Sequence, residues 1–261
     1  MVDLTLTVLG SGTSVGVPTI GCDCKVCTSA DPRDQRLRPS IMLRYENRTV
    51  IIDTGPDFRQ QCIRANIRRV DAVLYTHAHA DHILGLDDLR PFNFHQREVI
   101  PIFLTEHTLS VIRRVFAYIF HEGETESSRP RISPVLFDDE PFSIWGVEFL
   151  PIPVKHGTGP CHGFRFGPVA YLTDHSEIPE ESLAKLEGLE VLFLDALRYK
   201  PHPTHSSIDQ SLKTVARLQP KQTYFTHISH DLMHERAQSL LPADVKLAYD
   251  GLEIRVGVTL S

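Results

Sequence analysis

Apolar runs of strand length recur along the whole chain and are separated by polar turns. They cover Leu4 to Leu9, Ile41 to Tyr45, Val50 to Ile52, Ala72 to Tyr75, Ile102 to Leu104, Val147 to Ile152, Val169 to Leu172, Val191 to Leu194 and Thr223 to Phe225. Strand pairs without helices are predicted to dominate the first half, and helices to alternate with strands in the second. This pattern favours the α/β class, as an αββα sandwich of two β-sheets with flanking helices.

Amphipathic patterns typical of helices lie between several of these runs. They follow Asp57 and Thr105, lie between Pro179 and Gly188, run from Ser207 to before Pro220, and extend from about Asp231 to Leu240. Ser207 and Gln210 stand in the relation of a capping box. Residues 121–134, rich in Glu, Ser and Pro, are predicted to be a polar connection. Nothing in the chain resembles a long flexible linker, so residues 1–261 are expected to form a single domain.

Composition and charge exclude some classes of protein. The 261 residues are 41% hydrophobic and 23% charged, with no apolar run of about 18 residues and no signal peptide, so we expect a cytoplasmic protein without a membrane segment. The net charge is -6 and the basic residues are scattered, which makes nucleic acid an unlikely partner. The 14 histidines are the unusual feature, because imidazole binds metals and transfers protons near neutral pH.

Four side chains of the kinds that bind metals stand within six positions, directly after the apolar run that ends at Tyr75. They are His77, His79, Asp81 and His82. In an extended segment the two residues at positions 77 and 79 project to the same side, and a turn can bring the next two to a neighbouring point. The segment is therefore predicted to serve two metal ions.

Three more candidate ligands follow other apolar runs. His156, Asp174 and His227 each lie one to three residues beyond a predicted strand, where a rigid sheet can hold a side chain at its edge. A lone His or Asp in such a place is usually a turn residue. With the first segment, however, they form a set of imidazole and carboxylate ligands that suits Zn, Mn or Fe.

Three of the five cysteines also stand together, as Cys22, Cys24 and Cys27. Residues this close would strain a disulfide, and three thiolates with one His would make a closed structural zinc site. His230, three residues after His227, is the candidate for the fourth ligand. Zinc held there would brace the loop that delivers His227.

These motifs resemble the metallo-β-lactamase-fold hydrolases over nearly the whole chain. The resemblance includes Gly10, Ser11 and Gly12 after the first strand, and Asp53, Thr54 and Gly55, which in that family buttress the metal loop. It implies one metal on His77, His79 and His156, a second on Asp81, His82 and His227, and Asp174 as the bridge. β-Lactamases of this fold usually place Cys or Ser at the bridge, and the oxygen-reducing di-iron branch places Glu at position 79. With these two branches set aside, the activity that the resemblance implies is hydrolysis of a phosphoester, a thioester or a lactone.

Within this fold, the cysteine cluster resembles that of one family, the PhnP cyclic phosphodiesterases of the carbon-phosphorus lyase pathway. Gly16, Val17 and Pro18 precede Gly21 and the cysteines as they do in that family. The resemblance implies structural zinc on Cys22, Cys24, Cys27 and His230, Mn or Zn in the catalytic pair, and a homodimer. It further implies that a hydroxide activated by two metals attacks a small, cyclic ribose-type phosphodiester while His205 protonates the leaving oxygen.

Several alternatives remain open at this stage. A thioesterase or lactonase of glyoxalase II type, an RNA 3′-end processing nuclease, and a PqqB-like non-hydrolytic protein would share the metal ligands. The residues alone do not separate His202 from His205 as the acid, and Asp195 is predicted to orient that acid or a ligand imidazole. Cys161 is interpreted as a loop thiol, and none of the clustered arginines is placed in the site.

Overall fold

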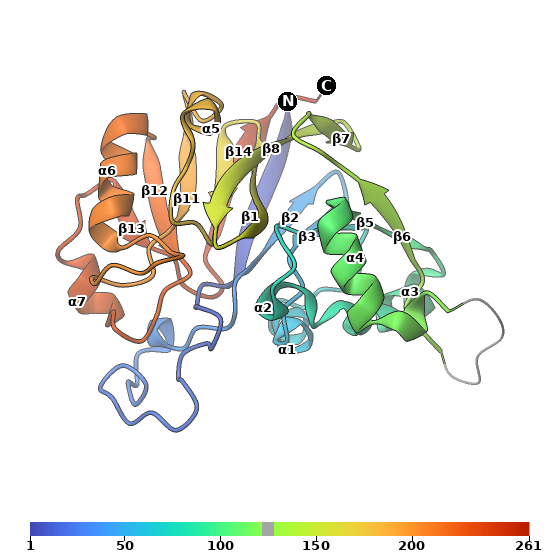
Figure 1. Cartoon of the computed structure of the whole chain (residues 1–261), viewed down its shortest axis with the longest axis horizontal. Helices are drawn as coiled ribbons and strands as arrows, with labels where there is room; N and C mark the ends of the chain where they lie inside the picture. The colour runs from blue at the N-terminus through green and yellow to red at the C-terminus, as the bar shows by residue number, and fades with distance from the viewer. Residues whose placement is uncertain (122–127, 261) are drawn as a thin grey trace.

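Two seven-stranded β-sheets pack face to face in a computed structural model, which describes residues 1–121 and 128–260 (Figure 1). The first sheet contains β1 (Val2–Gly10), β2 (Ser40–Tyr45), β3 (Arg48–Ile52), β4 (Ala72–Leu74), β5 (Ile100–Leu104), β6 (Ile132–Leu136) and β14 (Glu253–Val258). The second contains β7 (Phe142–Ile144), β8 (Val147–His156), β9 (Gly159–Phe166), β10 (Val169–Leu172), β11 (Val191–Asp195), β12 (Gln222–Thr226) and β13 (Val245–Leu247).

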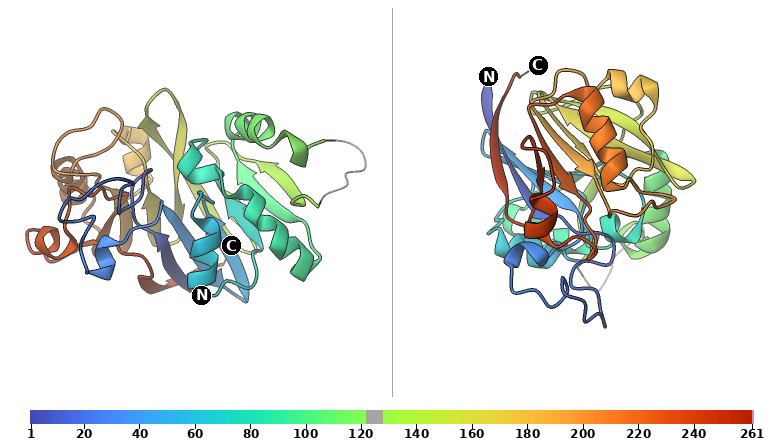
Figure 2. Two further views of the ribbon diagram at one scale, coloured as in Figure 1. Left: turned by 90° about the horizontal axis from the view of Figure 1, so that it is seen from below. Right: turned by 90° about the vertical axis from the view of Figure 1, so that its left-hand side faces the viewer.

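Helices cover the outer face of each sheet (Figure 2). Over the first sheet lie α1 (Phe58–Arg64), α2 (Ala80–Ile83), α3 (Arg90–Gln96) and α4 (Glu106–Val115), and over the second lie α5 (Glu180–Ala184), α6 (Ile208–Leu218) and α7 (His234–Gln238). Short 3₁₀ turns cover Pro32–Asp34, Leu86–Leu89 and Ala117–Ile119. The αββα sandwich expected from the sequence is therefore confirmed.

The period-two alternation of the strands explains the central core. In β1, Leu4, Leu6 and Val8 are buried between the sheets, where they meet Phe149 and Phe164 of the second sheet. A second apolar layer lies under the helices of the first sheet, and a third lies under α5, α6 and α7. The predicted capping box of α6 is also confirmed.

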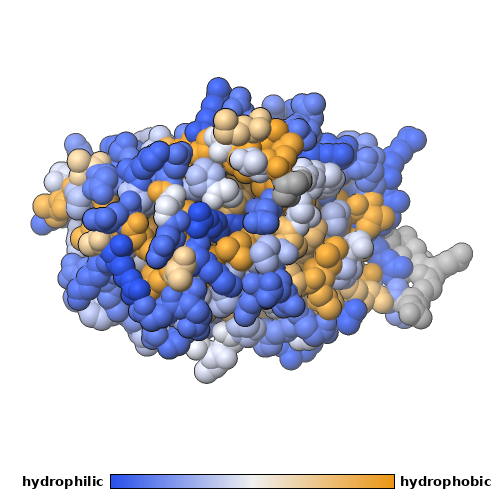
Figure 3. Space-filling view, turned by 90° about the horizontal axis from the view of Figure 1, so that it is seen from above, coloured by the Kyte–Doolittle hydropathy of each residue, from blue (hydrophilic) through white to orange (hydrophobic). Residues whose placement is uncertain are grey.

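Some sequence-based expectations were wrong. The first half holds four α-helices, of which α2 and α3 were not predicted. Both are short and contain few apolar residues, so no helical period was visible in the sequence. The predicted connection over 121–134 ends earlier, since β6 begins at Ile132, while residues 122–127 lie outside the described part of the chain. No helix of the described residues is long and apolar enough to cross a membrane. Seen from above, hydrophilic residues cover most of the face and hydrophobic residues form separate groups (Figure 3).

Strand direction brings the candidate ligands together. β3 and β4 are parallel, as are β10, β11 and β12, so their carboxyl ends share an edge in each sheet. His77 follows β4, Asp174 follows β10 and His227 follows β12. The two termini lie together at the opposite end of the sandwich (Figure 1).

Candidate metal centre

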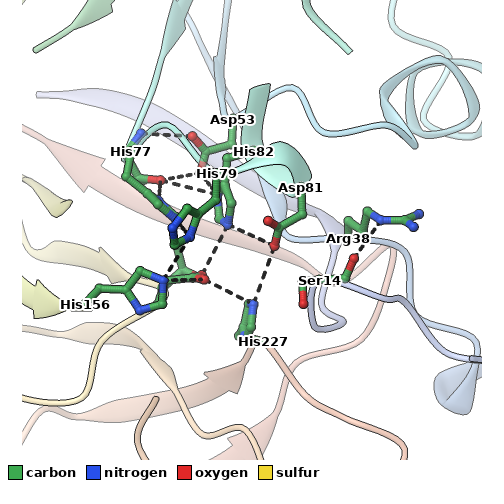
Figure 4. A network of polar contacts seen from close by, with 12 residues as sticks. Ser14, Arg38, Asp53, His77, His79, Asp81, His82, His156 and His227 are labelled. Carbon is green, nitrogen blue, oxygen red and sulfur yellow. Dashed lines mark hydrogen bonds and ion pairs between the residues drawn. The ribbon is translucent and has the colours of Figure 1, made fainter. Parts of the chain in front are cut away.

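A buried carboxylate holds the segment that follows β4. The backbone N–H and the hydroxyl of Thr76 donate to the two oxygens of Asp53, at 2.9 and 2.8 Å, and Nδ1 of His82 donates to the same carboxylate at 2.7 Å. Asp53 is fully buried after β3. These bonds fix both ends of the segment 76–82 and leave Nε2 of His82 facing the neighbouring ligands (Figure 4).

The first group of candidate ligands consists of His77, His79 and His156. Nδ1 of His79 lies 2.9 Å from Nε2 of His77 and 3.1 Å from Nε2 of His156, so the three rings converge on one point (Figure 4). Nδ1 of His156 donates to the carbonyl oxygen of Thr204 at 2.8 Å. This bond selects the tautomer of His156 whose Nε2 is free to bind a metal.

The second group consists of Asp81, His82, Asp174 and His227, and Asp174 lies between the two groups. Its Oδ1 is 3.4 Å from Nε2 of His82. Its Oδ2 is 3.2 Å from Nε2 of His227 and 3.8 Å from Nε2 of His156. One carboxylate therefore faces ligands of both groups, which is the arrangement expected of a bridge between two ions.

The donor set fits a pair of divalent cations. Oδ2 of Asp81, Nε2 of His82 and Nε2 of His227 are buried and make no hydrogen bond within the described part of the chain. Buried polar atoms are normally paired, and imidazole nitrogens and carboxylate oxygens are the ligands of Zn and Mn. The sequence-predicted residues are thus together in space, and their role as ligands stays a prediction.

Burial and charge set the protonation of the two groups. Burial lowers the pKa of His77 and of His156, which keeps these imidazoles neutral and able to bind a metal. Burial alone would raise the pKa of Asp174, but His227 and His82 hold it well below its ordinary value. The centre thus combines the ionised carboxylate of Asp174 with two imidazoles, those of His77 and His156, that burial keeps neutral.

Unusual backbone geometry accompanies three of these residues. Asp53, Asp174 and His227 have positive φ values of 66°, 47° and 56°. Non-glycine residues rarely adopt this conformation, and those that do are enriched in Asp, Asn and His and cluster at functional sites. Each residue ends a strand, so the turn directs its side chain along the sheet edge.

The cysteine cluster closes around the predicted fourth ligand. Nδ1 of His230 lies 3.3 Å from Sγ of Cys22, 3.7 Å from Sγ of Cys24 and 3.4 Å from Sγ of Cys27. The backbone N–H of Cys27 lowers the pKa of the Cys24 thiol to about 7, whereas burial raises that of Cys27 to about 11. Three sulfurs around one imidazole nitrogen form a suitable tetrahedral set for zinc.

Arg36 holds the loop that carries His230. Its fully buried guanidinium donates to the carbonyl oxygens of Ser229 and Leu232 at 2.9 and 2.7 Å, on either side of His230, and pairs with Asp34 at 2.8 Å. Nothing in the sequence pattern singled out this buried ion pair.

We expect Arg36→Met to destabilise the fold by about 3–5 kcal/mol, because it leaves the carboxylate of Asp34 buried without its cationic partner. Urea unfolding should show this loss, with partial recovery in Arg36→Met/Asp34→Asn. The matched control is Arg33→Met, which breaks the exposed pair with Asp31 and should cost below about 1 kcal/mol. Equal losses in the two single variants would contradict the argument.

His205 is the histidine of the 201–206 segment that reaches the metal centre. A ring nitrogen of His205 lies within 4.8 Å of ligand atoms of His156 and Asp174, while His202 stands farther out, 5.1 Å from His205 between ring centroids. Nδ1 of His205 donates to Oδ2 of Asp195 at 2.8 Å. The structure thus separates two residues that the sequence could not.

Asp195 contacts two imidazoles at once. Its Oδ1 lies 3.9 Å from Nδ1 of His227, and the rings of His205 and His227 stack with centroids 4.5 Å apart. The carboxylate is fully buried at the end of β11 and also accepts the backbone N–H of His175. The two orienting roles that the sequence offered as alternatives are therefore both compatible with its position.

Other residues differ from their sequence-based interpretation or were missed. Cys161 is not a loop thiol: it is buried in β9 and its Sγ donates to the carbonyl oxygen of Asp174 at 3.4 Å. The carbonyl of Thr204 that orients His156 carried no sequence signal, because every residue has such a group. Arg38 bonds to the carbonyl of Ser14 and to Asp57 beside the centre, without contacting a candidate ligand (Figure 4).

Comparisons with known proteins agree with this geometry. The family model described as "Beta-lactamase superfamily domain" matches residues 48–228. The crystal structure of a protein described as a new diphosphatase from the PhnP family is 51% identical, covers 100% of both chains and superposes with a TM-score of 0.94.

Curated relatives also match by sequence. An octanoyltransferase of Porphyromonas gingivalis is 36% identical over 248 residues, which cover 94% of this chain and 50% of that protein, so the chain spans half the length of this relative. Coenzyme PQQ synthesis protein B of Methylorubrum extorquens is 34% identical over 219 residues, covering 73% of this chain and 72% of that protein.

Proposed function

The chain belongs to the β-lactamase superfamily and, within it, to the PhnP family, and from this premise we propose that it is a binuclear metal-dependent phosphodiesterase. Its substrate would be a small disubstituted phosphate, and a cyclic ribose-type phosphodiester is the first candidate. The observation that carries the proposal is the position of Asp174, whose two oxygens face both groups of candidate ligands.

In the proposed reaction the metals would activate water and stabilise charge, and the residues of the chain would hold the metals in place. His77, His79 and His156 would hold one divalent ion, and Asp81, His82 and His227 the other, with Asp174 shared. When bound, the ions would lower the pKa of water and offset the negative charge that grows on the phosphoryl oxygens. The buried bonds from Asp53 and Thr204 would keep the imidazoles in the tautomers that this task needs.

His205 would provide the proton for the leaving oxygen. Asp195 accepts a hydrogen bond from Nδ1 of His205, so Nε2 is the nitrogen that is available to the substrate. The side chain is 11% exposed, which places it at the boundary between the buried ligands and solvent. Asp195 would act as a positioning residue, since it reaches the substrate only through His205.

A phosphoanhydride is the second candidate for the scissile bond. It is favoured by the similarity to the 51% identical protein, which is described as a diphosphatase. Both bonds are P–O bonds to a disubstituted phosphorus and would use the same metals. They differ in the leaving group: a phosphate leaves more easily than an alkoxide and needs less help from an acid.

A side-by-side assay tests the class of reaction. Metal-reconstituted enzyme would be given bis-p-nitrophenyl phosphate, a cyclic ribose phosphate, a nucleoside diphosphate derivative and S-lactoylglutathione. Turnover of any of the three phosphorus compounds well above the metal-only rate supports the proposal. The faster of the cyclic ribose phosphate and the nucleoside diphosphate derivative identifies the bond that is cleaved. Turnover of the thioester alone would replace the proposal with the glyoxalase II-type alternative.

Other activities have weaker support. The octanoyltransferase name belongs to a protein twice as long, so it does not assign acyl transfer to the half that this chain matches. A PqqB-like non-hydrolytic role would give bound metal without turnover on any activated ester. RNA 3′-end processing would call for a basic surface, whereas the net charge is -6. The homodimer and the cytoplasmic location stay predictions.

We further propose that Cys22, Cys24, Cys27 and His230 hold a structural zinc, with Mn or Zn in the catalytic pair. Cys24→Ser should remove about one zinc per chain by elemental analysis, because a tetrahedral site loses one of its four ligands. Activity should fall about 10–100-fold, since His227 stands three residues from His230 and loses its brace. Cys62→Ser, a core thiol distant from the cluster in sequence, is the control for zinc content. Unchanged zinc in Cys24→Ser would reject the site.

A further inference from the structure

A cavity of about 500 Å³ is lined by residues on and next to α1 and α3, the helices that cover the outer side of the first sheet. None of the residues that line it belongs to the metal centre or to the cysteine cluster. Cavities of about 300–1,000 Å³ are typical of sites for small molecules. The metal chemistry proposed above gives this cavity no role.

The inner part of the cavity is apolar. Cys62, Ile67 and Phe92 line it and are 8%, 7% and 8% exposed, so they present a packed hydrophobic surface. Ile63 lines the same cavity and is 64% exposed, so it adds solvent-exposed apolar surface to the lining. A ligand that covered Ile63 would remove this apolar surface from water.

Basic side chains also line the cavity. Arg59, Arg68 and His95 are exposed there, and among the described residues no carboxylate lies within ion-pair distance of either guanidinium. By contrast, the nearby Arg64 and Arg69 are paired, with Asp250 at 3.0 Å and with Asp71 at 2.6 Å.

One acidic residue opposes this charge. Asp88 is the carboxyl among the lining residues, so with the two guanidinium groups the cavity keeps a net positive charge. An arginine without a partner, next to an apolar surface, is suited to bind a carboxylate, phosphonate or phosphate group through two parallel hydrogen bonds.

We propose that this cavity is a second ligand site, which binds a small organic anion with an apolar body. The apolar body would lie against Ile63, Ile67 and Phe92, and the acid group would pair with Arg59 or Arg68. A simple inorganic anion would gain the charge interaction without the hydrophobic contact, so it would bind more weakly. Either a carboxylate or a phosphorus acid could supply the charge, and the test separates them.

The fluorescent probe 8-anilinonaphthalene-1-sulfonate, an apolar anion, allows a direct test on the full chain loaded with metal. The probe should bind the native protein and be displaced by octanoate or by benzylphosphonate; the stronger competitor identifies the acid group. Arg59→Glu/Arg68→Glu should weaken probe binding at least tenfold, because it reverses the charge around the cavity. Ile63→Asp should also weaken it, because the apolar contact is lost.

Arg255→Glu/Lys246→Glu is the matched control. Both side chains are exposed on strands away from the cavity, and the change in charge is the same. This variant should bind the probe within twofold of the native protein, and circular dichroism should show that all variants are folded. Equal weakening in the two double variants would overturn the proposal, as would displacement by inorganic phosphate as effective as by the organic anions.

Discussion

Replacing Asp174 by alanine should abolish measurable phosphodiester hydrolysis, a loss well beyond the 10–100-fold that is typical when an outer-shell partner is removed. Asp174 faces both groups of candidate ligands, with Oδ2 at 3.8 Å from His156 of the first group and at 3.2 Å from His227 of the second. In the proposed centre its removal would leave two cations close together without the negative charge that offsets their repulsion. Initial rates on bis-p-nitrophenyl phosphate and metal content by elemental analysis measure the two effects together.

Two controls make this result specific. Asp244→Ala removes an exposed carboxylate of the same kind and should keep native activity and metal content. Circular dichroism should show that Asp174→Ala is folded, since the strands around it are held by their own ladders. Native turnover with a full complement of metal in Asp174→Ala would refute the binuclear centre.

Replacing His205 by alanine should give a loss that depends on the leaving group. On a cyclic ribose phosphate, whose departing oxygen is a poor leaving group, we expect a fall of about 10²–10⁴ in kcat. On bis-p-nitrophenyl phosphate the nitrophenolate leaves without a proton, so the fall should be below about tenfold. Both substrates would use the same metals. A much larger fall in kcat on the cyclic ribose phosphate than on bis-p-nitrophenyl phosphate therefore identifies His205 as the proton donor.

Variants of the neighbouring residues separate catalysis from structure. His202→Ala, one imidazole farther from the centre, should cost less than about tenfold on both substrates. Asp195→Asn should reproduce the leaving-group dependence of His205→Ala in weaker form, because it disturbs the orientation of His205 and leaves the imidazole in place. Equal losses on both substrates in His205→Ala would exclude it as the acid.

The sequence alone predicted the sandwich and the residues that meet at its edge. His77 to His82 form a local motif whose spacing can be read directly, and His156, Asp174 and His227 each follow an apolar run. Of the helices over the first sheet, α1 and α4 were predicted, whereas α2 and α3 were missed because four and seven residues are too few for a period of 3.6 to show. The positive φ values at Asp174 and His227 left no signal in the sequence either.

What the sequence by itself determined is therefore the chemistry: which side chains are present, and that they stand where strands end. The tertiary structure decided which of them work together. Arg36 meets Ser229 across 193 positions, and His156 meets Thr204 across 48. Asp195 faces His205 rather than His202, and Arg64 pairs with Asp250 whereas Arg59 has no ion pair within 4.0 Å among the described residues. The physical reason is that hydrogen bonds and ion pairs depend on distances of a few ångströms between atoms, which only the folded path of the backbone sets.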